Sequence, residues 1–521
     1  MAKPSLHSAF ALSRREVGWV CLVILTFIAI NFAIASRTPT VNPDEVEYVD
    51  PAANWYLGQG FTSTLWAQDR QEFWAGNVPL YQIVLAGFFQ LFGFGFFQAR
   101  VVNTLLAGFS GWMIWYALKR SEWIKTAPYR LLSLVLVLSG SVSTQTIRTI
   151  RPDTMMFTIC AAVFLVWTIR PVKWRLPAVF LSSSLLLPAG LPMLPYSILM
   201  LALVLVSFGT GLIKTAAAAL TGMVGGMGWL CLFYGHFSSI RAFTDIVMPF
   251  TIVGANNSSF ASKLAIKFVG DAVDYPDTIF TSFFGNPFEF ISPKTLFDYS
   301  SALLFLLIVG LTAWQWARLE SMQKRLALFA VLMVLIVPPS LHIAAHYRSM
   351  YRWMTYMPLC VVVPCFVEAV LRGTKERAIH QAVGGILFAT ILLGVPARTI
   401  LVLPWWSERS IGPLNEAAQR IVSKSDVVIG DSKVYFAVRP LAKTIFMVGL
   451  PARGRFDLIK DLPKSEITLL CLRPDEFEAM ASTIGGNWHR VASGNPSQEK
   501  ELEQTRYNVN FYRRSGTIKD N

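Results

Sequence analysis

The chain has 521 residues, of which 54% are hydrophobic and 15% charged, and its mean hydropathy is +0.47. A soluble globular protein of this length carries more charge, so the composition is typical of a protein that crosses a membrane many times. The net charge of +14 does not indicate nucleic-acid binding, because the Lys and Arg residues stand in short clusters between apolar segments. That arrangement is the one that sets membrane orientation.

Apolar runs long enough to cross a bilayer predict about eleven transmembrane helices. They cover residues 17–36, 101–118, 131–147, 153–169, 176–191, 192–213, 215–235, 300–317, 326–345, 353–371 and 382–403. No convincing small-residue cleavage site follows the first run, which is therefore predicted to be a retained helix rather than a signal peptide.

The basic loops support one orientation of these helices. If Arg14 and Arg15 are cytoplasmic, the segments KRSEWIKTAPYR, RPVKWR, RLESMQKR and LRGTKER also fall in the cytoplasm, as the positive-inside rule requires. This agreement holds only if residues 78–97 lie in the outer interface as a juxtamembrane helix. The outer face then carries long loops at 36–100 and 236–299 and everything after residue 403. We expect the protein to act on that face, and the asymmetry argues against a secondary transporter.

The character of the chain changes after residue 403. Helices are predicted over 412–426 and 475–486, and short strands over 427–431, 466–473 and 507–514. The sequence therefore predicts a transmembrane domain over 1–403 and a small extracytoplasmic α/β domain over 404–521, large enough for a core of its own.

Carboxylates gather where the first apolar helix ends. The segment NPDEVEYVD holds Asp44, Glu45, Glu47 and Asp50. A structural explanation is that Asp44 is an N-cap and that Glu45 and Glu47 favour the first turn of a short helix. A functional explanation is a general base, since partial burial at a membrane surface moves the pKa of a carboxylate toward neutrality.

A second group of charged residues, in the segment TIRTIRPDTMMF, precedes the fourth apolar run. Pro152 suits the first turn of a helix and Asp153 suits a helix start, so capping explains both. Arg148 and Arg151 lie on the face that positive charge usually avoids. They need an anionic partner, and a lipid headgroup or a phosphate is the natural one.

A third group lies in HIAAHYRSMYRWMTYMP. His342 and His346 share a helix face, but with no third ligand evident a substrate-contacting or interfacial role is favoured over zinc. Arg348 and Arg352 either contact a phosphate or extend their charged groups to the interface. The sequence predicts no cofactor and leaves a divalent metal open.

With these motifs, the chain resembles the GT-C superfamily of polyprenyl-phosphate-dependent glycosyltransferases. The resemblance is greatest to bacterial members related to protein O-mannosyltransferases and aminoarabinose transferases. It is carried by NPDEVEYVDPAANWYLGQGF, VPLYQIVLAGFFQLFGFGFFQARVVNTLLAGFSG and RPDTMMFTICAAVFL. It covers about 1–170 through these motifs, and the remainder through hydropathy and the segment YRWMTYMP.

The resemblance implies a role for several residues. Asp44, with Glu45 as its neighbour, corresponds to the catalytic base, Asp153 to a second acidic residue, and Arg352 and Tyr356 to residues that bind the lipid phosphate. It also implies an inverting transfer from a polyprenyl monophosphate at a bacterial inner membrane. The chain departs from the aminoarabinose transferases before Pro79, where Asn77 and Val78 replace a Glu-Lys pair.

The sequence and the resemblance together predict a GT-C-like multi-pass glycosyltransferase with a cytoplasmic N-terminus and a periplasmic C-terminal domain. Its predicted partners are a polyprenyl-phosphate-linked sugar donor, a lipid or polymer acceptor such as a glycolipid, polysaccharide or protein, and membrane lipids, without nucleic acid. The alternatives are a polymerase or ligase of lipid-linked glycans and a non-catalytic transporter. The predicted catalytic residues are Asp44, Glu45 and Asp153, and the predicted substrate-binding residues are Arg148, Arg151, His346, Arg348, Arg352 and Tyr356.

Overall fold

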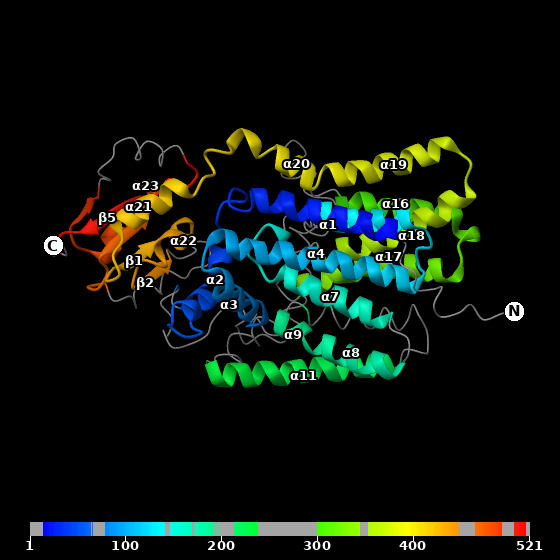
Figure 1. The fold of residues 1–521 in the computed structure, drawn as a ribbon, viewed down its shortest axis with the longest axis horizontal. Helices are drawn as coiled ribbons and strands as arrows, with labels where there is room; N and C mark the ends of the chain where they lie inside the picture. The colour runs from blue at the N-terminus through cyan, green and yellow to red at the C-terminus, as the bar shows by residue number, and fades with distance from the viewer. Residues whose placement is uncertain are drawn as a thin grey trace.

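A bundle of apolar helices makes up most of the protein, and a mixed α/β unit lies at one end of it (Figure 1). The computed structural model describes residues 14–63, 65, 79–140, 146–168, 172–190, 193, 196, 213–237, 300–343, 353–447, 464–491 and 505–516. The helices before the α/β unit are α1 (Arg14–Ile34), α2 (Pro43–Tyr56), α3 (Pro79–Phe92), α4 (Phe96–Ser121), α5 (Ala127–Ser139), α7 (Asp153–Trp167), α8 (Val172–Ser184), α9 (Leu186–Ala189), α11 (Ile213–Phe237), α16 (Ser300–Gln315), α17 (Ser321–Ile343), α18 (Trp353–Gly373), α19 (Arg377–Leu392), α20 (Val395–Ile400) and the 3₁₀ turn η7 (Leu403–Trp405).

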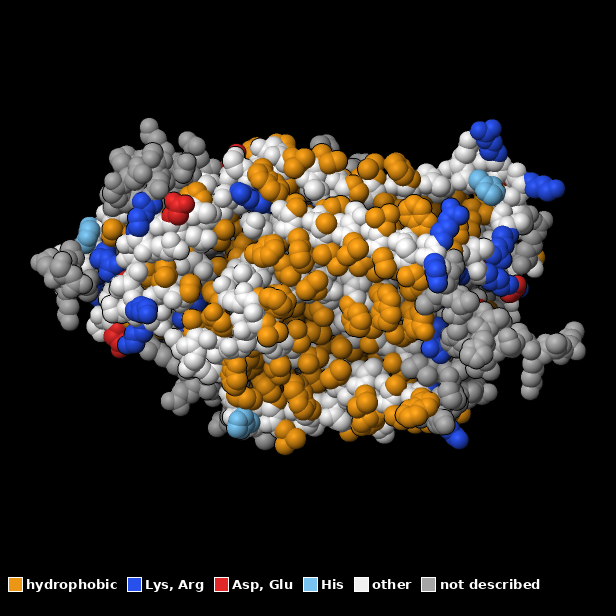
Figure 2. Space-filling view, viewed as in Figure 1, with side chains coloured by type: hydrophobic (Ala, Val, Ile, Leu, Met, Phe, Trp, Pro, Cys, Tyr) orange, Lys and Arg blue, Asp and Glu red, His pale blue; other side chains and the backbone are white. Residues whose placement is uncertain are grey.

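The described helices include several that can cross a membrane. Five are long and apolar enough, over Arg14–Ile34, Phe96–Ser121, Ile213–Phe237, Trp353–Arg372 and Arg377–Trp405, and shorter apolar helices accompany them. Apolar side chains cover the middle of the bundle, and basic side chains gather toward its two ends (Figure 2). The chain is a multi-pass helical membrane protein, whereas the count of about eleven spans stays a prediction. Nearly all of the predicted span 192–213 and of the loop 236–299 lies outside the described residues.

The segment predicted to lie along the outer interface is not one continuous helix. It consists of α3, which ends at Phe92, and the first residues of α4, which begins at Phe96. Gly93 separates them in the left-handed conformation, with φ +82°, which glycine adopts without steric cost. The 14 residues of α3 span about 21 Å, less than the roughly 30 Å of a bilayer core. This length favours the predicted interfacial position, beside α2 at the sheet end of the bundle (Figure 1).

The C-terminal residues form a five-stranded mixed sheet with the order β2-β1-β3-β5-β4. Its strands are β1 (Val427–Gly430), β2 (Thr444–Met447), β3 (Leu469–Leu472), β4 (Trp488–Arg490) and β5 (Asn510–Arg514), and its helices are α21 (Gly412–Ile421), α22 (Tyr435–Val438) and α23 (Pro474–Ile484). The central strand β1 is parallel to β2 and β3, whereas β5 is antiparallel to β3 and β4. The predicted helices and strands are present, and the prediction missed β2 and β4.

The two faces of the sheet belong to different cores. Val427 and Ile429 point to one face, where α23 covers them with Met480. Val428, between them, points to the other face, whose core is continuous with that of the helix bundle. One face of the sheet therefore has a core of its own and the other shares the core of the bundle, whereas a separate domain over 404–521 stays a prediction.

A buried polar network joins the α/β unit to α2. The Tyr435 hydroxyl donates to Asp50 Oδ1 at 2.6 Å, and the Arg439 guanidinium donates to the side-chain oxygens of Asn54 and Gln59. Asp50, Asn54 and Arg439 are all fully buried. Because a buried charge is costly unless it is hydrogen-bonded, this network fixes α2 against the sheet unit as well as against the bundle.

Helices α8 and α11 approach closely through two glycines spaced four residues apart. A Cβ at Gly222 would overlap the carbonyl oxygen of Phe180, and one at Gly226 would overlap that of Ser184, whereas a Cβ at Gly228 would meet nothing within 4 Å. Small residues at this spacing allow membrane helices to pack backbone against backbone.

We expect Gly226→Ala to lower the thermal unfolding midpoint of the detergent-purified protein, because overpacking of this kind costs about 1–3 kcal/mol. The matched variant Gly228→Ala adds the same methyl group to the same helix in open space. It should unfold at or above the wild-type midpoint, and equal losses in the two variants would show that the close approach is not stabilising.

Candidate active site

The carboxylate-rich segment forms the first turn of α2. Asn42 is the N-cap, and not Asp44 as in the structural explanation considered for this segment. The Asn42 Oδ1 accepts from the Glu45 N–H, and the Glu45 carboxylate accepts from the Asn42 N–H in return. This reciprocal pair is a capping box, with Pro43 at the first helical position. The cap uses a side-chain oxygen of Glu45 as its acceptor and leaves the Asp44 carboxylate available for other contacts.

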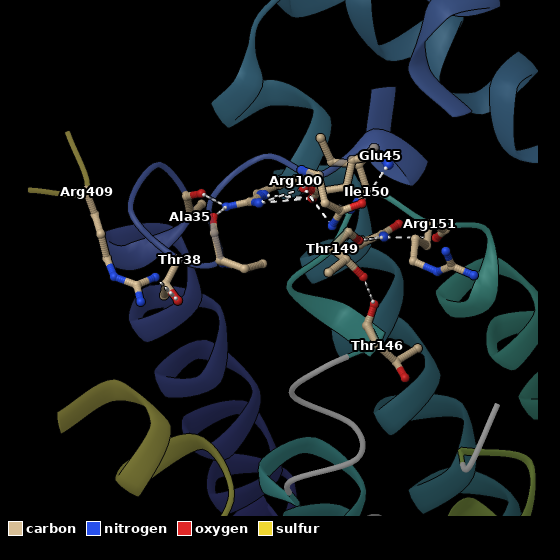
Figure 3. A network of polar contacts seen from close by, with 12 residues as sticks. Ala35, Thr38, Glu45, Arg100, Thr146, Thr149, Ile150, Arg151 and Arg409 are labelled. Carbon is tan, nitrogen blue, oxygen red and sulfur yellow. Dashed lines mark hydrogen bonds and ion pairs between the residues drawn. The ribbon is translucent and has the colours of Figure 1, made fainter. Parts of the chain in front are cut away.

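Glu45 is the centre of a fully buried ion pair with Arg100 of α4. The Arg100 guanidinium donates to both carboxylate oxygens at 3.0–3.2 Å, and the exposed fractions are 1% for Arg100 and 0% for Glu45. Arg100 also donates to the carbonyls of Ala35 and Pro39, and Glu45 accepts from the backbone N–H of Ile150 (Figure 3). These contacts link the end of α1, the start of α2, α4 and the turn before α7.

Arg151 joins the two other candidate carboxylates. Its Nη1 lies 2.5 Å from Asp44 Oδ2, and its Nε lies 3.0 Å from Asp153 Oδ2. The second oxygen of Asp153 accepts from the indole N–H of Trp353, at the start of α18, at 3.1 Å. The structure thus brings Asp44, Arg151 and Asp153 together, and these three residues are called the carboxylate centre below.

Exposure separates the three acidic candidates. The side chain of Asp44 is 23% exposed, against 1% for Asp153 and 0% for Glu45. Asp44 is therefore the carboxylate that a second molecule can reach. Asp153 is oriented by two donors on its two oxygens, and Glu45 is fully occupied by structural contacts.

Two residues with no predicted role line the carboxylate centre. Tyr81 of α3 is fully buried, and burial, with the negative charge of Glu45 as a further cause, raises the pKa of its phenol well above the usual range. Its hydroxyl approaches the Asn103 side chain outside hydrogen-bonding geometry. The Asn103 amide donates to the carbonyls of Thr149 and Arg151, so it fixes the backbone that carries Arg151.

The remaining predicted binding residues are not at this centre or are not described. Arg148 donates to Asn31 of α1 and Thr399 of α20. Tyr356 is buried, and its hydroxyl donates to the Leu136 carbonyl at 2.9 Å. His346, Arg348 and Arg352 lie outside the described residues. Within the described ranges, no group of three or more His, Cys, Asp or Glu side chains could hold a metal ion.

The sequence contained a signal for Arg100 that the prediction did not use. Arg100 precedes a long apolar run of α4, far from the Lys119 and Arg120 of its last turn, and such a charge in a membrane protein needs a partner in the protein interior. Trp353 and Tyr81 carry no comparable signal, since aromatic residues are frequent throughout an apolar chain.

No protein-family model matches the chain, and no curated protein matches it either. Among solved structures it is similar to ArnT from Cupriavidus metallidurans bound to undecaprenyl phosphate, with 16% identity and a TM-score of 0.49 over 95% of this chain and 98% of that chain. It is also similar to the Archaeoglobus fulgidus oligosaccharyltransferase tethered with an acceptor peptide (10% identity, TM-score 0.49, 94% of this chain and 74% of that chain). A third is the arabinofuranosyltransferase AftD from mycobacteria, with 15% identity and a TM-score of 0.47 over 97% of this chain and 40% of that chain.

The Glu45–Arg100 pair leads to a prediction for stability. Arg100→Met leaves the Glu45 carboxylate buried without its counter-ion, which costs about 3–5 kcal/mol, so the variant should unfold at a clearly lower temperature in detergent. The double variant Arg100→Met, Glu45→Gln removes the stranded charge and should recover part of the loss. An unchanged midpoint for the single variant would contradict the structural role given to the pair.

Proposed function

We propose that the protein is a membrane-embedded glycosyltransferase that moves a sugar from a polyprenyl-phosphate donor to an acceptor on the outer side of the membrane. The observation that carries the proposal is the carboxylate centre. One partly exposed carboxylate stands at a helix start, and an arginine fixes it beside a second, buried carboxylate. The sequence motifs that resemble GT-C enzymes place these carboxylates among the catalytic residues.

The proposed reaction is a single displacement at the anomeric carbon of the donor sugar. The acceptor hydroxyl forms the new bond to this carbon, and its proton passes to the Asp44 carboxylate. The bond from the anomeric carbon to the phosphate oxygen breaks, and its electron pair leaves with the polyprenyl phosphate. A displacement from the opposite side inverts the anomeric configuration.

Arg151 and Asp153 have positioning roles in this proposal. Arg151 holds the Asp44 carboxylate in one orientation, which matters because catalysis by a general base depends on reach and alignment. Asp153 accepts from Arg151 and Trp353 and is 1% exposed, so it would act through Arg151, which it holds in position beside the Asp44 carboxylate. Glu45 acts through the position of α2 and not on the substrate.

The phosphate of the donor needs cationic partners that the carboxylate centre does not supply, because both edges of Arg151 already face carboxylates. The predicted partners Arg348 and Arg352 precede Trp353, whose side chain reaches Asp153. We propose these two arginines as the partners on the basis of the sequence alone, since a guanidinium would stabilise the charge of the leaving phosphate.

The decisive experiment is Asp44→Asn in purified protein reconstituted in liposomes with a radiolabelled polyprenyl-phosphate sugar and a crude envelope acceptor. Loss of a general base should reduce sugar transfer by about 10²-fold or more, with an unchanged unfolding temperature. Transfer at the wild-type rate would show that Asp44 is not the base.

The control is Asp475→Asn, which neutralises a carboxylate that is 69% exposed on the sheet unit and should leave transfer intact. The same preparation separates the alternatives. Turnover with a diphosphate-linked oligosaccharide but not with the monophosphate donor indicates a polymerase or ligase. Counterflow of a lipid or solute that survives Asp44→Asn indicates a transporter.

A further inference from the structure

A cationic cluster lies just beyond the end of α1, where three distant parts of the chain meet. Arg409, in the segment after η7, donates to the hydroxyl oxygen of Thr38 at 3.4 Å, and Thr38 belongs to the turn that follows α1. Arg506, in the segment before β5, donates its backbone N–H to the Glu408 carbonyl at 2.7 Å. These contacts hold Arg409 and Arg506 beside each other at the turn after α1.

Among the described residues, Arg409 has no carboxylate within ion-pair distance. Burial lowers the pKa of its guanidinium and repulsion from Arg506 lowers it further, whereas Tyr507 and Glu408 act in the opposite direction. The Glu408 carboxylate is shared with Arg506, whose Nε lies 3.9 Å from it. The two arginines and the one glutamate therefore leave an excess of positive charge at this place.

Two buried polar atoms of the cluster have no hydrogen-bond partner in the described part of the chain, namely Arg409 Nε and the Tyr507 hydroxyl. Tyr507 is fully buried, and its hydroxyl approaches the backbone N–H of Val41 without completing a hydrogen bond. Arg409 and Tyr507 act on the pKa of each other, so the two groups lie near one another. A buried polar group without a partner is costly, and an anion with several acceptor oxygens would pair both.

A phosphate group meets these requirements. One edge of a guanidinium binds two phosphate oxygens side by side, and a tyrosine hydroxyl can donate to a third. The C-terminal end of α1 offsets roughly half of an elementary charge, but it provides no acceptor for Arg409 Nε or for the Tyr507 hydroxyl. A phosphodiester carries one negative charge, so it balances the excess charge and also pairs the donors.

The apolar neighbours of the cluster indicate that the phosphate belongs to a membrane lipid. The stretch Arg377–Trp405 is long and apolar enough to cross a membrane, and its last residues include three side chains that are more than half exposed, Ile400, Leu401 and Leu403. Two tryptophans follow, and each lies under an arginine: Arg506 Cζ is 5.3 Å from the ring centre of Trp405, and Arg37 Cζ is 5.3 Å from that of Trp406. Tryptophans at the end of an apolar stretch are typical of the level of the lipid headgroups.

This place is distinct from the carboxylate centre, because Figure 3 shows Arg409 and Arg151 on opposite sides of Arg100. We infer that Arg409, Tyr507 and Thr38 form a binding site for the phosphate of an anionic membrane phospholipid, whose acyl chains lie along the exposed apolar residues before η7. A lipid bound there would join the end of α1 to the segment before β5. The site does not depend on the proposed reaction.

The test measures the thermal unfolding midpoint of the full-length protein in phosphatidylcholine nanodiscs that contain increasing fractions of phosphatidylglycerol. Phosphatidylcholine is the reference because its choline group carries a positive charge, which the arginines repel. Phosphatidylglycerol should raise the midpoint, since a ligand that binds only the folded state stabilises it by mass action. A wild-type midpoint that does not respond to phosphatidylglycerol overturns the proposal.

Arg409→Gln should require about tenfold more phosphatidylglycerol, or more, for half of this shift, because a hydrogen bond between charged groups contributes at least that much to binding. Arg409→Lys keeps the charge without the fork of donors and should lie between this variant and the wild type. An Arg409→Gln variant that responds like the wild type overturns the proposal.

Tyr507→Phe separates binding from folding. Its hydroxyl has no partner in the described chain, so in pure phosphatidylcholine the variant should unfold at or above the wild-type midpoint. Its response to phosphatidylglycerol should nevertheless be weaker. An equal loss of stability at every lipid composition would give the hydroxyl a purely structural role and overturn its place in the site.

The matched control is Arg14→Gln, which removes an exposed arginine from the opposite end of α1. This variant should respond to phosphatidylglycerol as the wild type does. If Arg14→Gln and Arg409→Gln weaken the response equally, the lipid is attracted by the basic protein as a whole, and the proposed site is overturned.

A competition arm identifies the source of the phosphate. Native mass spectrometry of the wild type should show bound phosphatidylglycerol that neither inorganic phosphate nor equimolar polyprenyl phosphate displaces. Displacement by inorganic phosphate would show that the acyl chains contribute nothing. Displacement by polyprenyl phosphate would assign the site to the donor. Either result overturns the phospholipid assignment, while the sugar-transfer assay of Asp44→Asn would be unaffected.

Discussion

The buried pair of Glu45 and Arg100 is the contact on which the rest of this end of the molecule depends. It is a charge pair without access to water, and every remaining donor and acceptor around it is a backbone group or cap from a different segment. A buried ion pair contributes little net stability but fixes geometry, because any shift strands a charge. The pair therefore fixes the positions of the segments around it. Because Asp44 is next to Glu45 in the first turn of α2, its position is fixed as well.

Hydropathy predicted most of the helices because a membrane-spanning helix is specified by one continuous property, its apolar length. Apolar length does not predict the carboxylate centre. Asp44 and Arg151 are 107 residues apart in the sequence, and no local sequence pattern predicts that their side chains are in contact. The expectation that Asp44 and Asp153 act together came from the resemblance of the motifs. The contacts of Arg151 with both carboxylates, and of Trp353 with Asp153, required the folded chain.

The starts of α2 and α7 were predicted close to where they lie, but composition left the N-cap of α2 undecided. Asn42, Asp44 and Glu45 all suit a helix start by composition, and only the backbone conformation decides that Asn42 is the cap. Arg148 and Arg151 look equivalent in the sequence, yet a short turn directs one toward α1 and α20 and the other toward α2. Local composition shows which residues are suited to be an N-cap or an ion-pair partner, whereas the backbone conformation and long-range packing determine which of them has that role.

The attachment of α2 to the sheet unit has a consequence for how the protein is made. Tyr435 and Arg439 contact Asp50 and Asn54 across 385 residues of chain. The ribosome therefore releases Asp50 and Asn54 long before Tyr435 and Arg439. Every helix of the bundle has left the ribosome before these hydrogen bonds can form. Until then α2 lacks its hydrogen bonds to Tyr435 and Arg439, and a nascent or truncated chain holds this helix only through the Glu45–Arg100 pair and its other contacts within the bundle. The full attachment of α2 is therefore reached only after the last part of the chain has been made.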